Sequence, residues 1–387
     1  MRYELIATAT FGLEAVVRRE IEKLDYKVLK TEDGKITFEG DKRAIVRSNL
    51  WLRTADRVLL KIAEFEARTF EELFQQTKAL MWEALIPPDG KFTVTGTSVK
   101  SQLHSVPACQ GICKKAIASR LGEVYMMETL PETGAEYTVK VTILKDRVTL
   151  TVDTSGFGLH KRGYRVKTVA APIKETLAAA MVQLSFWNKD RVLLDPCCGS
   201  GTIAIEAAMI GRNIAPGLSR SFACEEWEAI DKKLWKEEKK RAYDLMDNTS
   251  KLDIVAIDID KMAIEAAKEN AAKAGVDDCI RFINADMSRI KASQPSGIII
   301  TNPPYGERIG ERKQIAAIYS KYKKFFAENP SWSMFMVTTD KDIEGKVFGR
   351  KADRRRKLYN GRLEVCYYQF HGKKLGDNGK AKQAEQK

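Results

Sequence analysis

The chain has 387 residues, of which 44% are hydrophobic and 30% charged, and its formal net charge is +13. This composition excludes a fibrous or intrinsically disordered protein, and the length predicts two or three folded domains. There is no apolar run long enough to cross a membrane, no secretory signal pattern and no disulfide framework among the seven scattered cysteines, so we expect a cytoplasmic protein. The excess of Lys and Arg favours an acidic partner such as nucleic acid.

Residues 1–65 are predicted to form a small α+β module. Residues 3–7 alternate in polarity, apolar residues then recur at helical spacing up to Leu24, and two further alternating segments follow at 36–38 and 58–62. A second module of the same kind is expected over 66–155. It begins with the capping box formed by Thr69 and Glu72 and continues with a helix to Met81, another over 110–121, and alternating segments at 137–143 and 148–152.

The segment 156–174 is rich in Lys and Arg, contains no acidic residue and is interpreted as a basic linker. From 175 to 371 the predicted strands become short, continuously apolar runs separated by amphipathic helices, which is typical of a buried parallel sheet in an α/β domain. These runs lie at 192–194, 254–257, 298–300 and 334–337, with helices at 263–274 and 314–326.

The predicted parallel sheet ends in an antiparallel hairpin. Residues 357–359 and 363–368 flank Asn360-Gly361, a pair that favours a type I′ turn. The last residues, 372–387, have no apolar periodicity and are expected to form a disordered tail.

The first candidate site follows the strand at 192–194, where Asp195 precedes a loop containing Gly199 and Gly201. Glycines at the carboxyl end of a buried strand let the backbone approach a ligand closely. A dinucleotide site would need an acid about 20 residues further on. The next acid at the end of a predicted strand is Asp258, so the spacing disfavours a dinucleotide.

Two further strands end in carboxylates. Asp258 is suited to accept hydrogen bonds from ribose hydroxyls, and Asp286 to accept one from an adenine amino group. An acid after a strand is often only a helix N-cap, and we prefer that interpretation for Asp260. Three strand tips with acids in one sheet favour a bound nucleoside instead.

The fourth strand ends in Asn302-Pro303-Pro304-Tyr305. An exocyclic amine of a base is a poor nucleophile because its lone pair is delocalised into the ring. The Asn302 side-chain oxygen and the Pro303 carbonyl can accept its two hydrogens, while Tyr305 stacks on the base. An ordinary Pro-Pro turn is the structural alternative, which the three upstream strand tips make less favourable.

Together these motifs resemble the class I S-adenosylmethionine-dependent methyltransferases that modify base amino groups. Residues 99–105 with Gln110, Lys114 and Lys115 look like a THUMP RNA-binding module preceded by a ferredoxin-like segment. The full pattern, including Gly306-Glu307-Arg308, is similar to the bacterial 23S ribosomal RNA guanine-N2 methyltransferases. The resemblance implies a Rossmann-like catalytic domain, a mostly parallel sheet with an antiparallel edge hairpin, behind α+β ferredoxin-like and THUMP modules.

The resemblance also implies roles for residues of the four motifs. The catalytic set is Asn302, Pro303 and Tyr305, and the S-adenosylmethionine-binding set is Asp195, Cys197, Gly199, Gly201, Asp258, Ile259, Asp286, Met287 and Asn302. No metal is expected, because the three histidines lie far apart without ligand spacing. A long charged insert over 222–252 separates the first two motifs and predicts an extra helix of unknown role.

Basic residues outside the motifs are candidates for RNA phosphate contacts, although a charged run is more often a solvated face. These candidates are Lys100, Lys114, Lys115, Arg162, Arg165, Arg354, Arg355 and Arg356. We expect 23S rRNA as the partner. The alternatives that stay open are a transfer RNA guanine-N2 enzyme, an adenine-N6 methyltransferase and a non-catalytic RNA-binding assembly factor.

Overall fold

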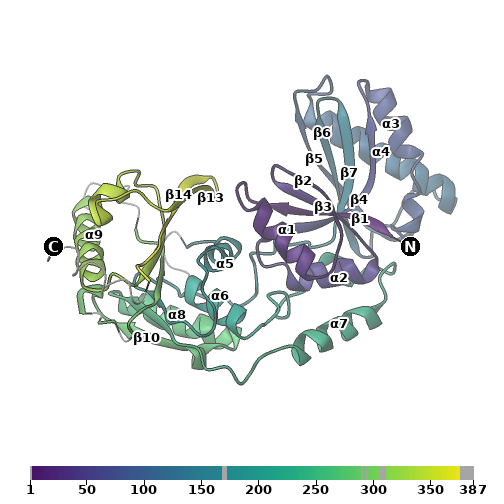
Figure 1. Ribbon diagram of the computed structural model, residues 1–387. Helices are drawn as coiled ribbons and strands as arrows, with labels where there is room; N and C mark the ends of the chain where they lie inside the picture. The colour runs from purple at the N-terminus through teal and green to yellow at the C-terminus, as the bar shows by residue number, and fades with distance from the viewer. Residues whose placement is uncertain (1, 168–171, 290, 293, 305–310, 375–387) are drawn as a thin grey trace. The chain divides into compact units, whose positions relative to one another are not determined.

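The computed structural model describes residues 2–167, 172–289, 291–292, 294–304 and 311–374, without the side chains of 311–314 (Figure 1). The chain forms two compact units. The first consists of Met1–Ala9, Val17–Leu159 and Arg220–Asp244, and the second of Thr10–Val16, His160–Ser219 and Leu245–Lys387. Among the described residues, no helix combines the length and apolar character needed to cross a membrane.

The first unit is built on one seven-stranded sheet with the order β2-β3-β1-β4-β7-β6-β5. The long strand β4 pairs with β1 on one side and with β7 on the other, both antiparallel. The two α+β modules predicted in series therefore share a single sheet. Its strands are β1 (Tyr3–Ala9), β2 (Val28–Glu32), β3 (Lys35–Gly40), β4 (Ala55–Glu66), β5 (Lys91–Val99), β6 (Glu136–Leu144) and β7 (Arg147–Asp153).

The helices of the first unit begin where capping chemistry favours them. The predicted capping box is confirmed: Thr69 Oγ1 accepts from the Glu72 amide at 3.2 Å, and the Glu72 carboxylate accepts from the Thr69 amide. The helix that it begins stops at Lys78, short of the predicted Met81. The helices are α1 (Glu14–Lys23), which crosses from the second unit, α2 (Lys42–Trp51), α3 (Phe70–Lys78), η1 (Trp82–Ala84) and α4 (Val106–Tyr125).

The charged insert forms the predicted extra helix, α7 (Lys232–Asp244), which follows the short turn η2 (Ala223–Glu225). This helix lies beside α2 in the first unit (Figure 1). Its Glu238 is 1% exposed and accepts two hydrogen bonds from Arg47, at 2.8 and 2.9 Å, and one from Arg43 at 2.7 Å. Residues 220–244, which include α7, therefore belong to the first unit, although the segments before and after them in the chain belong to the second.

The second unit contains a seven-stranded sheet with the order β10-β9-β8-β11-β12-β14-β13. Neighbours from β10 to β12 are parallel, whereas β14 is antiparallel to both β12 and β13, which confirms the predicted fold class. The strands are β8 (Leu193–Asp195), β9 (Ile254–Asp258), β10 (Ile280–Asn284), β11 (Ile298–Thr301), β12 (Ser333–Thr338), β13 (Arg354–Asn360) and β14 (Leu363–Phe370).

Alternate side chains of these strands enter two separate cores, as expected for a parallel sheet buried on both faces. Leu193, Ile254 and Ile298 pack with α5, α6 and α8, whereas Leu194 and Val255 pack with α9 and η5. The covering elements are α5 (Glu175–Leu184), α6 (Thr202–Gly211), α8 (Lys261–Ala274), η3 (Asp277–Cys279), η4 (Met287–Arg289), α9 (Glu311–Glu328) and η5 (Glu344–Phe348).

The basic segment 156–174, which the sequence predicts to be a linker, is divided between the two units. From His160 onward it belongs to the second unit. Arg162 is 2% exposed, and its guanidinium lies 3.3 Å from the carboxylate of Glu206, which is fully buried. Tyr164, also buried, donates to the same carboxylate. The predicted RNA contact of Arg162 is therefore wrong, because its charge is already compensated in the interior.

The hairpin of β13 and β14 is present, but its turn is shifted by one residue. Asn360 pairs with Leu363, so Gly361 and Arg362 are the central residues. Of these two only Gly361 has a positive φ, 65°, which is not the type I′ turn predicted for Asn360-Gly361. Residues 372–374 of the predicted tail are described, and the Gly372 amide donates to Ser333 Oγ; residues 375–387 lie outside the described part.

We predict that Glu238→Ala weakens the attachment of α7 by about 3 kcal/mol, since it leaves two arginines without their shared buried carboxylate. Burial alone would raise the pKa of Glu238, but the hydrogen bonds from Arg47 and Arg43 outweigh it and lower the pKa. Hydrogen exchange of the α2 and α7 amides should accelerate. Glu226→Ala, which removes an exposed carboxylate 3.9 Å from Lys232, is the matched control and should leave exchange unchanged.

Candidate functional site

The strand order of the second unit reverses at β8. From this strand the chain adds β9 and β10 on one side, and then β11 and β12 on the other. Because these strands are parallel, their carboxyl ends lie at one edge of the sheet, and the two loops leaving β8 and β11 diverge there. Ligands of open α/β sheets bind at such a reversal. The four predicted motifs all lie at this edge.

The loop after β8 takes a conformation that depends on glycine. Gly199 and Gly201 have φ values of 53° and 81°, in the left-handed region that other residues rarely adopt. A Cβ at Gly201 would also lie 3.0 Å from the Cβ of Ala267 on α8. The loop thus turns sharply into α6 and packs its backbone closely against α8 at Gly201.

Asp258, at the tip of β9, ties this loop to the next strand. Its carboxylate accepts from the Gly199 amide at 2.9 Å and from the Asp260 amide at 3.0 Å. Asp260 itself caps α8 by accepting from the Met262 amide, as we expected. Next to Asp258, the side chain of Ile259 is 72% exposed. The strand tip therefore presents an acceptor and an apolar surface side by side.

Asp195, at the end of β8, is a carboxylate with little solvation. It is 1% exposed, its Oδ1 accepts only a long 3.4 Å bond from the Cys197 amide, and its Oδ2 has no hydrogen-bond partner among the described residues. Burial, and to a lesser degree the nearby charge of Asp258, raise the pKa of Asp195 well above its usual range. A cationic ligand would compensate this carboxylate.

The tip of β10 contains an ion pair that the sequence did not reveal. Lys321 of α9 donates to both oxygens of Asp286, at 2.8 and 2.6 Å, and the Ser288 amide donates to one of them. The hydrogen bond from Lys321 is the main reason that the pKa of Asp286 falls to about 2. Asp286 is therefore a fixed, ionised acceptor. Met287, beside it in η4, is half-buried.

The tip of β11 places Asn302 directly after the buried Thr301 and directly before the buried Pro303. Thr301 Oγ1 lies 3.1 Å from the hydroxyl of Tyr322 on α9, and the Cys197 Sγ lies 3.7 Å from the same hydroxyl. Burial raises the pKa of the Cys197 thiol to about 12, so this side chain packs as a neutral group. Tyr305, the third predicted catalytic residue, lies outside the described residues.

Two side chains hold the β8 loop through hydrogen bonds that the sequence did not predict. Arg165 donates to Ser200 Oγ at 3.1 Å and to Thr202 Oγ1 at 3.0 Å, and its guanidinium is also paired with Glu175. Asn270 of α8 donates to the Ser200 carbonyl at 3.1 Å. Arg165, which we had assigned to RNA, is thus engaged within the second unit. No local sequence pattern indicates either contact, because each joins segments that are far apart in the chain.

Comparison with known proteins identifies the family. Residues 162–369 match the RMKL-like methyltransferase domain, residues 4–59 the RlmL ferredoxin-like domain and residues 67–153 the THUMP domain. The chain belongs to the RMKL-like methyltransferase family. The *Bacillus subtilis* (strain 168) protein named "Putative RNA methyltransferase YpsC" is 49% identical over 376 residues, which are 96% of this chain and 97% of that protein.

Two solved structures resemble this methyltransferase over nearly its whole length. The crystal structure of "SMU.472, a putative methyltransferase complexed with SAH" is 44% identical, with a TM-score of 0.91 over 97% of this chain and 99% of that one. A "predicted N6-adenine-specific DNA methylase" from *Listeria monocytogenes* is 47% identical, with a TM-score of 0.92 over 96% and 97% of the two chains.

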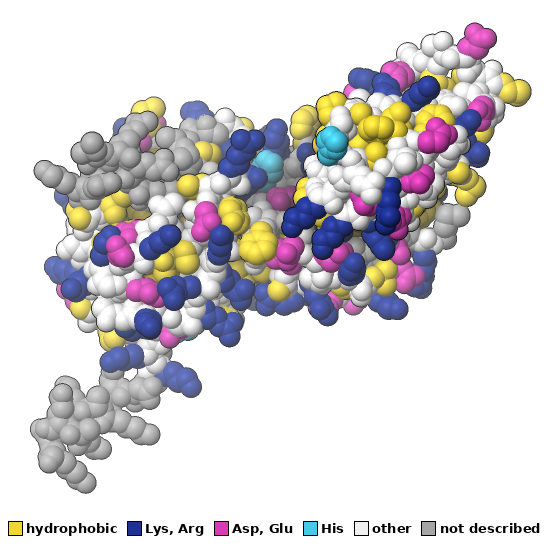
Figure 2. All heavy atoms as spheres, turned by 90° about the horizontal axis from the view of Figure 1, so that it is seen from above, with side chains coloured by type: hydrophobic (Ala, Val, Ile, Leu, Met, Phe, Trp, Pro, Cys, Tyr) yellow, Lys and Arg dark blue, Asp and Glu magenta, His cyan; other side chains and the backbone are white. Residues whose placement is uncertain are grey.

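The remaining predicted RNA contacts of this methyltransferase lie at the surface of both units. Lys100 is exposed, Lys114 lies 3.7 Å from Glu132 and over the Phe92 ring, and Lys115 lies over the Phe74 ring. On β13, Arg354 and Arg355 are exposed and Arg356 is half-buried. On the face shown in Figure 2, Lys and Arg side chains are spread among acidic and apolar ones. Their contact with RNA stays a prediction.

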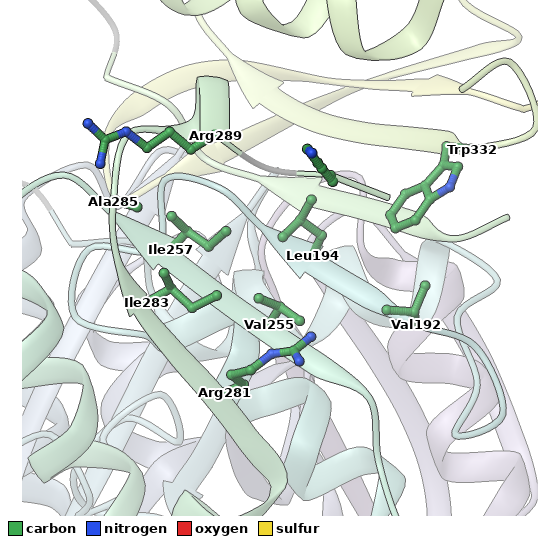
Figure 3. Close-up of a pocket in the computed structure, with 10 residues that line it drawn as sticks. Val192, Leu194, Val255, Ile257, Arg281, Ile283, Ala285, Arg289 and Trp332 are labelled. Carbon is green, nitrogen blue, oxygen red and sulfur yellow. The ribbon is translucent and has the colours of Figure 1, made fainter. Parts of the chain in front are cut away.

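A cavity of about 210 Å³ lies on the face of the sheet that packs with α9. Figure 3 shows aliphatic side chains of β8, β9 and β10 beneath it, with Trp332 at one end and Arg281 and Arg289 among its lining residues. None of the predicted cofactor residues lines it, although Leu194, Ile257 and Ala285 each directly precede one of them. Within the described residues, no group of three or more His, Cys, Asp or Glu is placed to hold a metal ion.

We predict that Lys321→Met destabilises the second unit by up to about 1 kcal/mol at pH 7, as expected for a partly exposed ion pair. The pKa of Asp286 is depressed, so the stabilisation is complete above the unfolded pKa of about 3.9 and is lost as pH falls through about 2. Urea unfolding should therefore show parent and variant converging between pH 4 and pH 2. Lys324→Met, on an exposed position of the same helix, should match the parent at every pH.

Proposed function

We propose that the protein is an S-adenosylmethionine-dependent RNA methyltransferase that modifies an exocyclic amino group of a base, and that the target is N2 of guanine in 23S rRNA. The observation that carries this proposal is the adjacency of Asn302-Pro303 and the acidic strand tips across the reversal between β8 and β11. The relative SMU.472, similar over nearly its whole length, was crystallised with SAH, the demethylated product of this cofactor.

The residues present fit S-adenosylmethionine. Buried Asp195, with one unpartnered oxygen, favours a cationic group, and the glycines of the β8 loop let the backbone approach the methionine portion. Asp258 retains acceptor capacity for ribose hydroxyls, while the exposed side chain of Ile259 provides an apolar surface for one face of adenine. Asp286 is an acceptor suited to the adenine amino group.

The cofactor supplies an electrophilic methyl group on a sulfonium. Asn302 and Pro303 supply two acceptors at the adjacent strand end, the side-chain oxygen of the first and the main-chain carbonyl of the second. Together they hold the two hydrogens of a base amino group and turn its lone pair toward the methyl. The new N–CH₃ bond forms as the S–CH₃ bond breaks, which leaves the neutral thioether SAH, and water then accepts one proton of the methylated nitrogen. This is catalysis by positioning and preorganised electrostatics.

RNA is the proposed substrate because the catalytic domain follows a THUMP domain in the same chain. The target base must be unpaired or flipped out, since an amino group within a duplex is inaccessible to such a pocket. The *Bacillus* relative is named as an RNA methyltransferase, whereas the *Listeria* relative is named as an adenine-specific DNA methylase. Adenine N6 is therefore the second candidate target, and transfer RNA is the alternative RNA.

The deciding experiment incubates the purified protein with radiolabelled S-adenosylmethionine and, separately, ribosomal RNA, transfer RNA and DNA, and then identifies the labelled nucleoside. Label in N2-methylguanosine from ribosomal RNA is the expected result. Label in N6-methyladenine, or in transfer RNA alone, would retain the mechanism and overturn the substrate. No label in any nucleic acid, with cofactor binding intact, would favour the non-catalytic assembly factor.

We predict that Asn302→Ala lowers kcat by about 10²–10³-fold and raises the Kd for S-adenosylmethionine far less than Asp258→Ala does, because its main effect is to remove one preorganised acceptor for the base. Asp258→Ala should instead raise that Kd by roughly tenfold to a hundredfold, since it removes a carboxylate that accepts hydrogen bonds. Single-turnover methylation and isothermal titration measure the two effects. Asn248→Ala, at an exposed loop position, is the control. Near-normal methylation by Asn302→Ala would refute the amino-group mechanism.

A further inference from the structure

The insert helix α7 is fixed to the first unit along one face. Its buried residues, Trp235, Glu238 and Ala242, are three and four positions apart and form a single stripe. Trp235 stacks on Phe222, and Glu238 binds the two arginines of α2 described above. Upstream, Trp227 stacks on Tyr137 of β6 and donates to the Glu136 carbonyl. The helix is therefore held at several points and has a defined outer face.

The charges of α7 are sorted between its two sides. Besides its last residue, Asp244, the helix contains two acidic residues, Glu237 and Glu238. Both are paired with Arg43 of α2. Glu237 is consequently not used to neutralise Lys233 or Lys240 of its own helix, as intrahelical pairing would do, whereas Glu238 has no lysine three or four positions away. Lys239 is paired with Glu225 below the helix, and Lys232 lies 3.9 Å from Glu226.

The outer face of α7 carries lysines that are not paired with a carboxylate. Lys233, Lys236 and Lys240 are exposed, and within the described part of the chain none of them forms an ion pair. Tyr243, 57% exposed, continues the same face, because positions 236, 240 and 243 follow the i, i+4, i+7 spacing. The result is a cationic stripe that ends in an aromatic ring, which we call the α7 stripe.

We infer that the α7 stripe binds the sugar-phosphate backbone of the RNA substrate. This inference rests on the proposed function, and it assigns the charged insert a role in the same reaction. Lysine side chains at this spacing can each approach a phosphate, and an exposed tyrosine next to them can stack on an unpaired base. The stripe lies on the unit that contains the THUMP domain, so both would act on one RNA.

A purely structural role for α7 accounts for the buried stripe but not for the outer one. Like charges four residues apart, Lys232 with Lys236 and Lys236 with Lys240, cost an isolated helix about 0.2–0.5 kcal/mol per pair. A helix that served only to join modules would be more stable with acidic residues at some of these positions. The uncompensated lysines are therefore better explained by a polyanionic ligand.

The test compares the full-length variant Lys233→Gln, Lys236→Gln, Lys240→Gln with a matched control, Lys251→Gln, Lys268→Gln, Lys273→Gln. The control lysines are also exposed and form no ion pair within the described residues. The Kd for an unmodified 23S rRNA transcript is measured by filter binding at 50, 100 and 200 mM KCl. SAH binding by calorimetry and hydrogen exchange of α7 verify that each protein is folded.

We expect the α7 variant to bind the transcript more weakly than the parent and to lose about two units of the slope of log Kd against log salt. Its affinity deficit should then shrink about 16-fold between 50 and 200 mM KCl, whereas the control should keep the parent slope within half a unit.

The inference fails if the α7 variant matches the control in Kd and slope while the parent still binds and methylates RNA, an outcome that leaves the proposed function intact. A loss of affinity that is equal at all three salt concentrations also overturns it, because phosphate contacts must be salt-dependent. If the parent itself neither binds nor methylates RNA, the proposed function and this inference fall together.

Discussion

The candidate site depends on one topological constraint, the reversal of strand order between β8 and β11. The parallel register pairs Ile298 with Leu193 and Ile299 with Leu194, so the two strands end at the same edge of the sheet. Asp195 and Asn302 are far apart in the sequence, and only this pairing brings their loops together. Ligands of open α/β sheets bind where neighbouring strands continue to opposite sides of the sheet in this way.

The loop after β8 is held in place by hydrogen bonds from side chains of neighbouring segments. Asp258 fixes the Gly199 amide, Asn270 fixes the Ser200 carbonyl, and Arg165 fixes two hydroxyls of the same loop. At the tip of β10, Lys321 of α9 holds the Asp286 carboxylate. Because the loop is already held in place, a ligand spends less of its binding energy on ordering the loop. Preorganisation of this kind favours both affinity and the alignment of reacting atoms.

The sequence predicted what is local and missed what joins distant segments. The apolar runs followed by Asp195, Asp258 and Asn302 identify strand tips because a buried strand and its terminal polar residue are adjacent in the chain. The shared sheet of the first unit was not predictable, since the pairing of β4 with β7 involves neither turn nor periodicity signals. The same reason explains Arg162: its partner Glu206 is 44 residues away, and a basic run gives no indication of a buried carboxylate.

The insert 222–252 illustrates this limit most fully, and also what a structure adds to a charged sequence. From the sequence alone, the Lys and Glu residues of α7 would be expected to form ion pairs with one another along the helix surface. In the structure Glu237 and Glu238 are paired with Arg43 of α2 instead. Lys233 and Lys240 therefore lose Glu237, the glutamate of their own helix that lies three or four positions away, whereas Lys236 has no acidic residue at that spacing in any case. The attachment of α7 to the first unit thus contributes to the positive charge of its outer face, and the order of residues in the helix contributes the rest.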